Sequence, residues 1–560
     1  MLFDPQQVPF SRRERFLTLS MMDGALMLRL VKGGDLRPGL GRLARIAFED
    51  ADGREAAVTL TLTPGELIAR APQAEVRFAI GANENLHVEG HGLSLVLHME
   101  GSRYDYAYRR PDGDYCLVAA YENVRMMPRV SKGQLSVDGN WRRDRSENVT
   151  CRFSGKDGFA GTLDLFAVEP PPPTVETLAE AATSAMTEFA DFAAGLPSPR
   201  SGGAMAHTLA AYILWSSTVP ACGKLTRPAI FMSKNEMINI WSWDNAFSAL
   251  GVAATDHALA FDQFAAIYDR QDSSGMLPDF INDRDVSFAF TKPPVHGWAI
   301  CTLIAAQPSW LTVRRRTYLA EHLERQVHWW LASTREGPAT LPAYPHGNDS
   351  GWDNASFFDG GGPVASPDLP TFLILCCDAM ALLCPAARQT WDDRGNELLR
   401  MLLAQLATDT DFGTRRVHCA TDLIHGQSLI QFMPLLLGKR LPDALANSLM
   451  QKLAAEFLTP WGPATEAPTS PYYESDGYWR GPIWAPTTAL IWDGLRSQGN
   501  HGLAREVARR FCTLCETSGM AENFDALSGV GQRDRAFAWT SAVYLMLSAD
   551  LKAIEKSDFP

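Results

Sequence analysis

The chain has 560 residues, of which 46% are hydrophobic and 21% are charged, and its formal net charge is -13. This length exceeds what one hydrophobic core organises, so two or more domains are expected. The acidic balance repels phosphate backbones and argues against nucleic acid as a partner, whereas a neutral sugar remains a possible substrate.

The N-terminal sequence MLFDPQQVPF lacks the apolar stretch and small-residue cleavage site of a secretory signal, and no run of 18 apolar residues occurs in the chain. We therefore expect no membrane span and a cytoplasmic location, in which the ten cysteines are reduced thiols. Cys512 and Cys515 form a CxxC pair, but the sequence offers no further ligands at zinc-site spacing. We expect no metal and no cofactor.

Residues 1–173 are predicted to form an antiparallel β-sandwich. Residues 86–100 and 161–169 alternate apolar and polar side chains, and turn signals such as Asp52-Gly53 recur between such segments. The four prolines at 170–173 cannot pair in a sheet and end this domain. Residues 174–200 are expected to form a linker helix.

Residues 201–560 are predicted to be helical. Twelve helices in paired succession fit an (α/α)6 toroid, which gathers its loops at one end around a central pit. The expected fold is therefore α+β and multidomain, with the sandwich followed by the toroid. The helices are expected near 203–217, 243–253, 255–270, 294–306, 311–333, 369–384, 386–407, 427–437, 442–458, 482–498, 501–517 and 536–553.

Tryptophans concentrate in the helical part, where fourteen of the fifteen lie after residue 200. Several stand in loop motifs, and an exposed indole in a concave site offers a flat apolar face to a sugar ring. For Trp329, Trp330 and Trp492 we favour a place in the hydrophobic core. The tryptophans expected at a sugar site are Trp241, Trp243, Trp298, Trp352, Trp479 and Trp484.

The segment 344–363 carries Asp349, Asp353 and Asp359 among glycines and aromatic residues. Inverting hydrolysis of a glycoside needs two carboxyl groups about 6.5–9.5 Å apart, one to protonate the leaving oxygen and one to activate water. A carboxyl group near Trp352 would be partly desolvated, which raises its pKa and suits the acid. The alternative is a calcium loop, since Asp349, Asp353 and Asn354 all offer oxygen ligands.

Three other segments carry candidate site residues. Asp244 heads a predicted helix, where it either caps the helix or binds sugar hydroxyls. In SDGYWRGPIW (475–484), Arg480 either packs at a helix entry or orients a carboxylate. Glu522 precedes a glycine-rich turn, and its context alone favours it only weakly. The chain contains no GxSxG, GxxxxGK[ST] or HExxH motif.

An ordered set of motifs spanning about 300 residues resembles glycoside hydrolase family 63 of the six-hairpin glycosidases, an inverting group that includes α-glucosidases and mannosylglycerate or glucosylglycerate hydrolases. The matching segments are WSWDNAFSALG (241–251), GMLPD (275–279), TKPPVHGWAI (291–300), DSGWDNA (349–355), YWRGPIW (478–484), ENFDALSG (522–529) and FAWTSA (537–542).

The resemblance implies that Asp353 is the general acid and Glu522 the general base, and that Asp244 binds the non-reducing sugar. Two departures bear on specificity. Asp349 stands where the family often has Glu, and the segment between Pro294 and Asp349 is short. The full set of residues expected to bind substrate is Asp244, Trp241, Trp243, Lys292, Trp298, Asp349, Trp352, Tyr478, Trp479, Arg480 and Trp484.

The sequence thus predicts an inverting, exo-acting hydrolase of an α-glucoside or a closely related α-linked sugar, acting on a small oligosaccharide or glycoside. Two alternatives stay open. An inverting phosphorylase would replace the base with bound phosphate, and a non-catalytic sugar-binding protein would keep the fold without the chemistry. Linkage, aglycone, the choice of glucose or mannose, and oligomeric state are not determined by the sequence.

Overall fold

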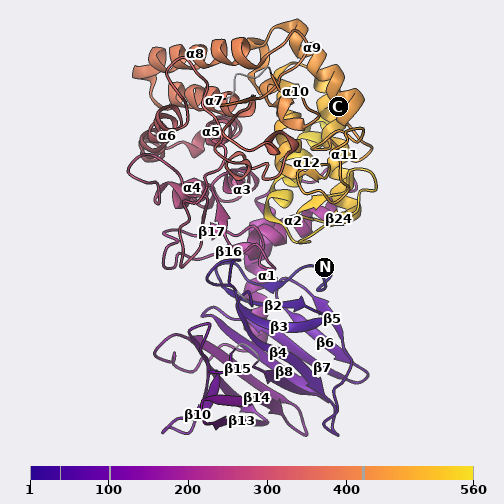
Figure 1. Ribbon diagram of the computed structural model, residues 1–560. Helices are drawn as coiled ribbons and strands as arrows, with labels where there is room; N and C mark the ends of the chain where they lie inside the picture. The colour runs from indigo at the N-terminus through magenta and orange to yellow at the C-terminus, as the bar shows by residue number, and fades with distance from the viewer. Residues whose placement is uncertain (1, 38, 100–101, 419–422, 559–560) are drawn as a thin grey trace.

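The computed structural model describes residues 2–37, 39–99, 102–418 and 423–558. It confirms the predicted architecture, because an N-terminal pair of antiparallel sheets is followed by a helical domain (Figure 1). Within these residues no helix is long and apolar enough to cross a membrane. The nine described cysteines are free thiols, and Cys419 lies outside the described residues.

Two antiparallel sheets form the sandwich. The seven-stranded sheet has the order β1-β2-β3-β4-β9-β14-β13, and the eight-stranded sheet has the order β10-β11-β12-β15-β8-β7-β6-β5. The strands are β1 (Phe10–Ser11), β2 (Leu17–Met22), β3 (Ala25–Leu30), β4 (Arg42–Glu49), β5 (Thr59–Leu62), β6 (Leu67–Ala71), β7 (Ala74–Ile80), β8 (Asn85–His91), β9 (Ser94–His98), β10 (Tyr106–Arg109), β11 (Tyr115–Ala119), β12 (Val124–Lys132), β13 (Gln134–Arg142), β14 (Arg145–Ser154) and β15 (Phe159–Phe166).

The alternating segment 86–100 is not one strand. Gly92 adopts φ +70°, a left-handed conformation that favours glycine, and the chain turns there from β8 in one sheet to β9 in the other. The alternation continues through the turn because both strands bury their apolar side chains between the sheets. Phe48 and Phe78, from opposite sheets, meet in this core with ring centroids 6.3 Å apart.

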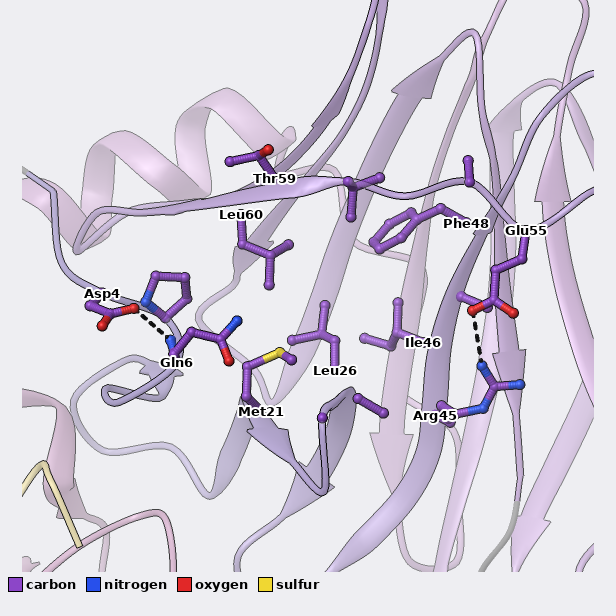
Figure 2. Close-up of a pocket in the computed structure, with 16 residues that line it drawn as sticks. Asp4, Gln6, Met21, Leu26, Arg45, Ile46, Phe48, Glu55, Thr59 and Leu60 are labelled. Atoms are coloured by element: carbon purple, nitrogen blue, oxygen red, sulfur yellow. Dashed lines mark hydrogen bonds and ion pairs between the residues drawn. The ribbon is translucent and has the colours of Figure 1, made fainter. Parts of the chain in front are cut away.

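A cavity of about 590 Å³ opens in the sandwich (Figure 2). Met21, Leu26 and Ile46 give it an apolar floor. At one end Arg45 pairs with Glu55 at 3.5 Å, so the cavity combines an apolar interior with a charged edge.

Helix α1 (Leu178–Ala194) connects the two parts of the chain. It begins with a capping box, in which Thr177 Oγ1 accepts a hydrogen bond from Glu180 N and the Glu180 carboxylate accepts one from Thr177 N. The helix packs against β7, β8 and α2. The domain boundaries at residues 173 and 200 stay a prediction.

Among the described residues, twelve helical segments follow at the predicted places. They are α2 (Ala204–Ser217), α3 (Asp244–Val252), α4 (His257–Tyr268), α5 (His296–Ala306), α6 (Val313–Ser333), α7 (Asp368–Leu383), α8 (Arg388–Leu406), η5 (Leu429–Arg440), α9 (Asp443–Lys452), α10 (Ala485–Ser497), α11 (His501–Ser518) and α12 (Ala538–Asp558). The segment expected at 427–437 is the 3₁₀ stretch η5, which contains Pro434 and a non-helical Gly438. The helix expected at 442–458 ends in a π turn, Leu453–Phe457.

The helical domain is built as a closed ring. Helices α3, α5, α7, η5, α10 and α12 each pack against the next, and α12 packs against α3. Inner helices are buried all round, as in α7, whereas outer helices such as α11 bury one face. Close crossings depend on glycine: a Cβ on Gly297 of α5 would lie 2.3 Å from the Cα of Cys376 in α7.

Short strand pairs organise the loops of the toroid. They are β16 (Thr218–Val219) with β17 (Ala229–Ile230), β18 (Ile240–Trp241) with β19 (Phe280–Ile281), β20 (Val364–Ala365) with β21 (Arg415–Arg416), and β22 (Ile483–Trp484) with β23 (Asn523–Phe524) and β24 (Gly531–Gln532). The β18–β19 and β22–β23 pairs place loops distant in sequence side by side.

Candidate active site

A narrow pit in the helical domain collects most of the predicted site residues. Its volume is about 50 Å³, against about 590 Å³ for the sandwich cavity, so size alone does not mark the site. What distinguishes the pit is its converging carboxylates and aromatic rings. It is lined by Met237, Trp241, Trp243, Asp244, Lys292, Gly351, Asp353, Tyr478, Trp479, Trp484, Glu522, Phe537 and Trp539.

Asp244 enters the pit from the first turn of α3. Trp241 N donates to Asn245 Oδ1 at 3.2 Å, which ties β18 to the start of the helix. Asp244 does not cap α3, whose N-cap is Trp243. The Asp244 side chain is 6% exposed, and no described residue donates a hydrogen bond to its buried Oδ2. A buried acceptor without a donor is unfavourable by about 1–3 kcal/mol, which a sugar hydroxyl would relieve.

Lys292 is a positively charged residue of the pit that lies beside Asp353 and Asp279. Its Nζ lies 3.4 Å from Asp353 Oδ1 and 3.5 Å from Asp279 Oδ1, and it donates to Asn348 O at 2.9 Å. Burial raises the pKa of Asp353, and Lys292 opposes that rise. Burial likewise raises the pKa of Asp279 to about 6 and that of Asp244 to about 8. Lys292 lowers the pKa of all three carboxyl groups, of which Asp244 and Asp279 are buried.

The loop that carries Asp353 is fastened on both sides. Asn354 Nδ2 donates to Gly477 O at 3.0 Å, and Asn354 Oδ1 accepts from Trp479 N at 3.0 Å. On the other side, Gly351 adopts φ +73°, and a Cβ there would lie 2.7 Å from the indole of Trp243. The Asp353 side chain remains 30% exposed, so its carboxyl group is accessible from the pit.

An aromatic cluster forms the floor of the pit. Trp479 and Trp484 stack with centroids 4.2 Å apart and an interplanar angle of 5°. Trp539 packs edge-on against Trp484 at 5.3 Å and Trp243 at 5.8 Å. We expected exposed indoles, but these side chains are at most 4% exposed. Their mutual packing fixes the shape of the pit and leaves only small apolar surfaces for a sugar.

Glu522 enters the pit from the segment directly before β23. Asn523 pairs with Trp484 across β22 and β23, and Glu522 N donates to Asp534 O at 2.7 Å. The Glu522 side chain is 5% exposed. Burial, with the negative charge of Asp534, raises the pKa of Glu522 to about 8, and Arg533 opposes this rise. A buried carboxylate with a raised pKa is a stronger base than one in water.

Four predicted residues do not line the pit. Trp298 Nε1 donates to Asp493 Oδ2 at 2.7 Å within the helix packing. Both Asp349 oxygens accept from backbone, from Thr291 N and His346 N at 2.9 Å. Trp352 is fully buried under Trp479.

Arg480 is the fourth residue outside the pit wall. It donates to Asn354 O at 2.7 Å and pairs with Asp359. Each of the four therefore supports the walls instead of facing the cavity.

The pit also contains residues that the sequence did not single out: Met237, Gly351, Phe537 and Trp539. Phe537 and Trp539 stand in FAWTSA, a segment that carries the family resemblance. That match could have identified them as site residues. Met237 stands in no such motif. It reaches the pit because the turn at 233–237 folds back, with Ser233 N donating to Met237 O at 3.0 Å.

Comparison with known proteins agrees with this geometry. A model of the mannosylglycerate hydrolase MGH1-like glycoside hydrolase domain matches residues 237–540, more than half of the chain. Mannosylglycerate hydrolases from Thermus thermophilus and Rubrobacter radiotolerans are 25% and 23% identical over 392 and 423 residues. These matches cover 54% and 58% of this chain and 93% and 92% of the relatives. The sandwich lies outside the matched family domain.

Solved structures show the same fold. The GH63 mannosylglycerate hydrolase from Thermus thermophilus, in complex with Tris and D-glycerate, has a TM-score of 0.55 at 20% identity and covers 61% of this chain and 99% of that chain. Neutral trehalase from Saccharomyces cerevisiae has a TM-score of 0.50 at 15% identity, covering 63% and 82%. The chain therefore belongs to the mannosylglycerate hydrolase MGH1-like glycoside hydrolases of family 63.

Proposed function

We propose that this enzyme hydrolyses a small α-linked glycoside with inversion, using Asp353 as general acid and Glu522 as general base. The observation that carries the proposal is the pit itself, where both carboxyl groups stand on the wall of one aromatic-floored cavity. Asp244, with its unpartnered Oδ2, binds a hydroxyl of the non-reducing sugar.

The reaction needs one protonated and one ionised carboxyl group. Asp353 donates its proton to the glycosidic oxygen, and Glu522 takes a proton from the water that attacks the anomeric carbon. Each proton transfer contributes roughly 10²–10⁴-fold to the rate. Lys292, beside Asp353, stabilises the carboxylate that the acid becomes after transfer. An α-glycoside therefore releases the β-anomer.

The substrate class is narrowed by the relatives. Mannosylglycerate hydrolases match the family domain, so we expect glycosylglycerates, with mannose or glucose as the sugar, ahead of α-glucobioses. The short segment between Pro294 and Asp349 leaves little chain for an extended leaving-group site, which fits a small aglycone.

The test is hydrolysis of mannosylglycerate, glucosylglycerate and α-linked disaccharides, with proton NMR of the first product. We expect initial β-anomer, and a loss of at least about 10²-fold in kcat in Asp353→Asn and in Glu522→Gln. Asp409→Asn, on an exposed loop after α8, is the matched control and should keep full activity. Initial release of the α-anomer would show that the enzyme does not invert. Near-normal activity of Glu522→Gln would show that Glu522 is not the general base.

The phosphorylase alternative has its own readout. A phosphorylase would replace the water with phosphate, and its turnover would require that anion. The cation nearest in sequence to Glu522 is Arg533, which pairs with Asp476 at 2.6 Å and donates to Asn523 Oδ1 at 3.1 Å. We expect the enzyme to turn over its substrate in phosphate-free buffer. If turnover required phosphate, the enzyme would be a phosphorylase and not a hydrolase.

A further inference from the structure

The turn at residues 233–237 lies between the sandwich and the pit. It precedes β18, and its last residue, Met237, lines the pit. Its neighbours in space come from both ends of the chain, from the sandwich strands and from the segment after β24. It therefore connects two parts of the molecule that lie far apart in the sequence.

The sandwich holds this turn through a buried arginine. Arg29 of β3 is fully buried, and its guanidinium donates to Lys234 O at 2.9 Å and to Asn235 O at 2.6 Å. The same side chain donates to Ser20 Oγ and Leu40 O within the sandwich. A planar guanidinium with five donors can hold two peptide carbonyls and its own domain at once.

A second buried cation fastens the turn in the reverse direction. The fully buried Lys234 sends its ammonium into the sandwich, where Nζ donates to Arg15 O at 2.6 Å and Ser11 Oγ at 2.9 Å. The pKa of Lys234 is lowered to about 7 by burial. Arg29 of the sandwich thus bonds the turn, and Lys234 of the turn bonds the sandwich, across the same interface.

The far side of the turn holds Asp534. Asn235 Nδ2 donates to Asp534 Oδ1 at 3.2 Å, and Glu236 N donates to Asp534 Oδ2 at 3.3 Å. Ala536 N donates to Oδ1 at 2.9 Å. The Asp534 carboxylate, 5% exposed, is therefore oriented by two donors from the turn and one from its own segment.

Asp534 in turn fixes the peptide of Glu522. Its carbonyl accepts from Glu522 N at 2.7 Å, the hydrogen bond that leads into the β23–β24 pair. Its carboxylate is the negative charge that contributes, after burial, to the raised pKa of Glu522. Arg533 lowers that pKa and Glu236 of the turn raises it, but Asp534 is the charge with the largest effect, and it also holds the backbone of Glu522.

We propose that Arg29 and Asp534 are positioning residues of the hydrolase, and that the sandwich holds the catalytic base in place through the 233–237 turn. The inference rests on the proposed role of Glu522. The sandwich is then part of the catalytic apparatus, although it lies outside the matched family domain. Removing the Arg29 contacts lets the turn move, and Asp534 and Glu522 move with it.

The experiment compares two buried arginines. Arg29→Met removes the contacts to the turn. Arg12→Met is the matched control, because the Arg12 side chain is 2% exposed and bonds Glu188, Ser184 and Ile80 O instead of the turn. Both variants lose a buried cation of the sandwich, and only Arg29→Met loses side-chain contacts to the turn that leads to Glu522.

The assay uses an α-glycosyl fluoride alongside the natural substrate. Fluoride leaves without a proton from Asp353, whereas Glu522 must still take a proton from water. We expect kcat on the fluoride to fall at least about 10-fold in Arg29→Met with KM within about twofold, since a displacement of about 1 Å costs up to 10²-fold. The kcat of Arg12→Met should stay within about twofold of the wild-type value. Asp353→Asn should regain activity on the fluoride, because this substrate needs no proton from the acid.

Asp534→Asn supplies a second readout that a purely structural role would not move. Loss of its charge should shift the ionisation of Glu522 in the pH profile of kcat/KM, near 8 in the wild type, to lower pH, because Asp534 raises the pKa of Glu522. Equal kcat values in Arg29→Met and Arg12→Met, or an unmoved ionisation near 8 in Asp534→Asn, would overturn the proposal. Activity in Glu522→Gln would instead overturn the assignment of Glu522 as the base. This outcome is distinct from the comparison of Arg29→Met with Arg12→Met, so the two proposals can fail separately.

Discussion

Glu522→Gln should inactivate the enzyme and stabilise it, more strongly at alkaline pH. The pKa of Glu522 is raised from 4.5 to about 8 in the folded protein, so folding favours its protonated form. The stability that this proton supplies is fully present below pH 4.5 and is lost as the pH rises through about 8. Glutamine copies the protonated side chain at every pH.

The size of the effect follows from the same values. At about 1.4 kcal/mol for each pH unit, the change in pKa sets an upper limit of about 5 kcal/mol above pH 8 and about 1 kcal/mol at pH 5.5. Water entering the pit reduces the first figure. The expected signature is therefore a gain in unfolding free energy of a few kcal/mol at pH 9 and little gain at pH 5.5.

Urea unfolding followed by tryptophan fluorescence measures this difference, because fourteen of the fifteen tryptophans lie after residue 200 and report the helical domain. Glu506→Gln is the control. Arg509 and Arg510 lower the pKa of Glu506 to about 2, so its ionised form stabilises α11. That variant should be slightly destabilised, equally at pH 5.5 and pH 9. A Glu522→Gln variant no more stable than wild type at pH 9 would refute the reasoning.

Three further predictions concern the pit. Because the base must be ionised, the pH profile of kcat/KM in the wild type should contain an ionisation near 8, and a profile with no ionisation above the ordinary glutamate pKa of about 4.3 would contradict the raised pKa of Glu522. Gly351→Ala places a Cβ 2.7 Å from Trp243 at φ +73° and should lower the unfolding free energy by about 1–3 kcal/mol together with kcat, whereas Gly502→Ala, with open space around it, should not destabilise the fold. Lys292→Met removes the cation that holds down the pKa of Asp353, so the ionisation of Asp353 in the pH profile of kcat/KM should move to higher pH; an unchanged profile would show that Lys292 does not act on the acid.

Local chemistry in the sequence predicted much of this molecule. The predicted linker helix begins at a capping box of Thr177 and Glu180, and apolar periodicity marks outer helices such as α11, because both depend on residues within a turn or two of one another. The ordered motifs indicated the family, and most of the site residues predicted from them do line one pit. Whether Asp353 and Glu522 act as acid and base stays a prediction for the variants above.

Other features depended on partners that lie far away in the sequence. Asp349 is an acidic residue in the right motif, yet its oxygens bond the backbone of Thr291 and His346. Of the indoles expected to be exposed, Trp243, Trp352, Trp479 and Trp484 are buried, and each packs on a ring from another loop. Position within a motif does not determine which side of a loop faces the cavity.

The sequence by itself determined the helices, the alternating strands and the family, since these are encoded by local periodicity, capping and ordered motifs. Only the tertiary structure decided which side chains face the pit and that Arg29 reaches Glu522 through Lys234, Asn235 and Asp534. The physical reason is that a buried cation or carboxylate takes whatever donors or acceptors the packed chain brings to it. Those partners are chosen by the whole fold and leave no pattern among neighbouring residues.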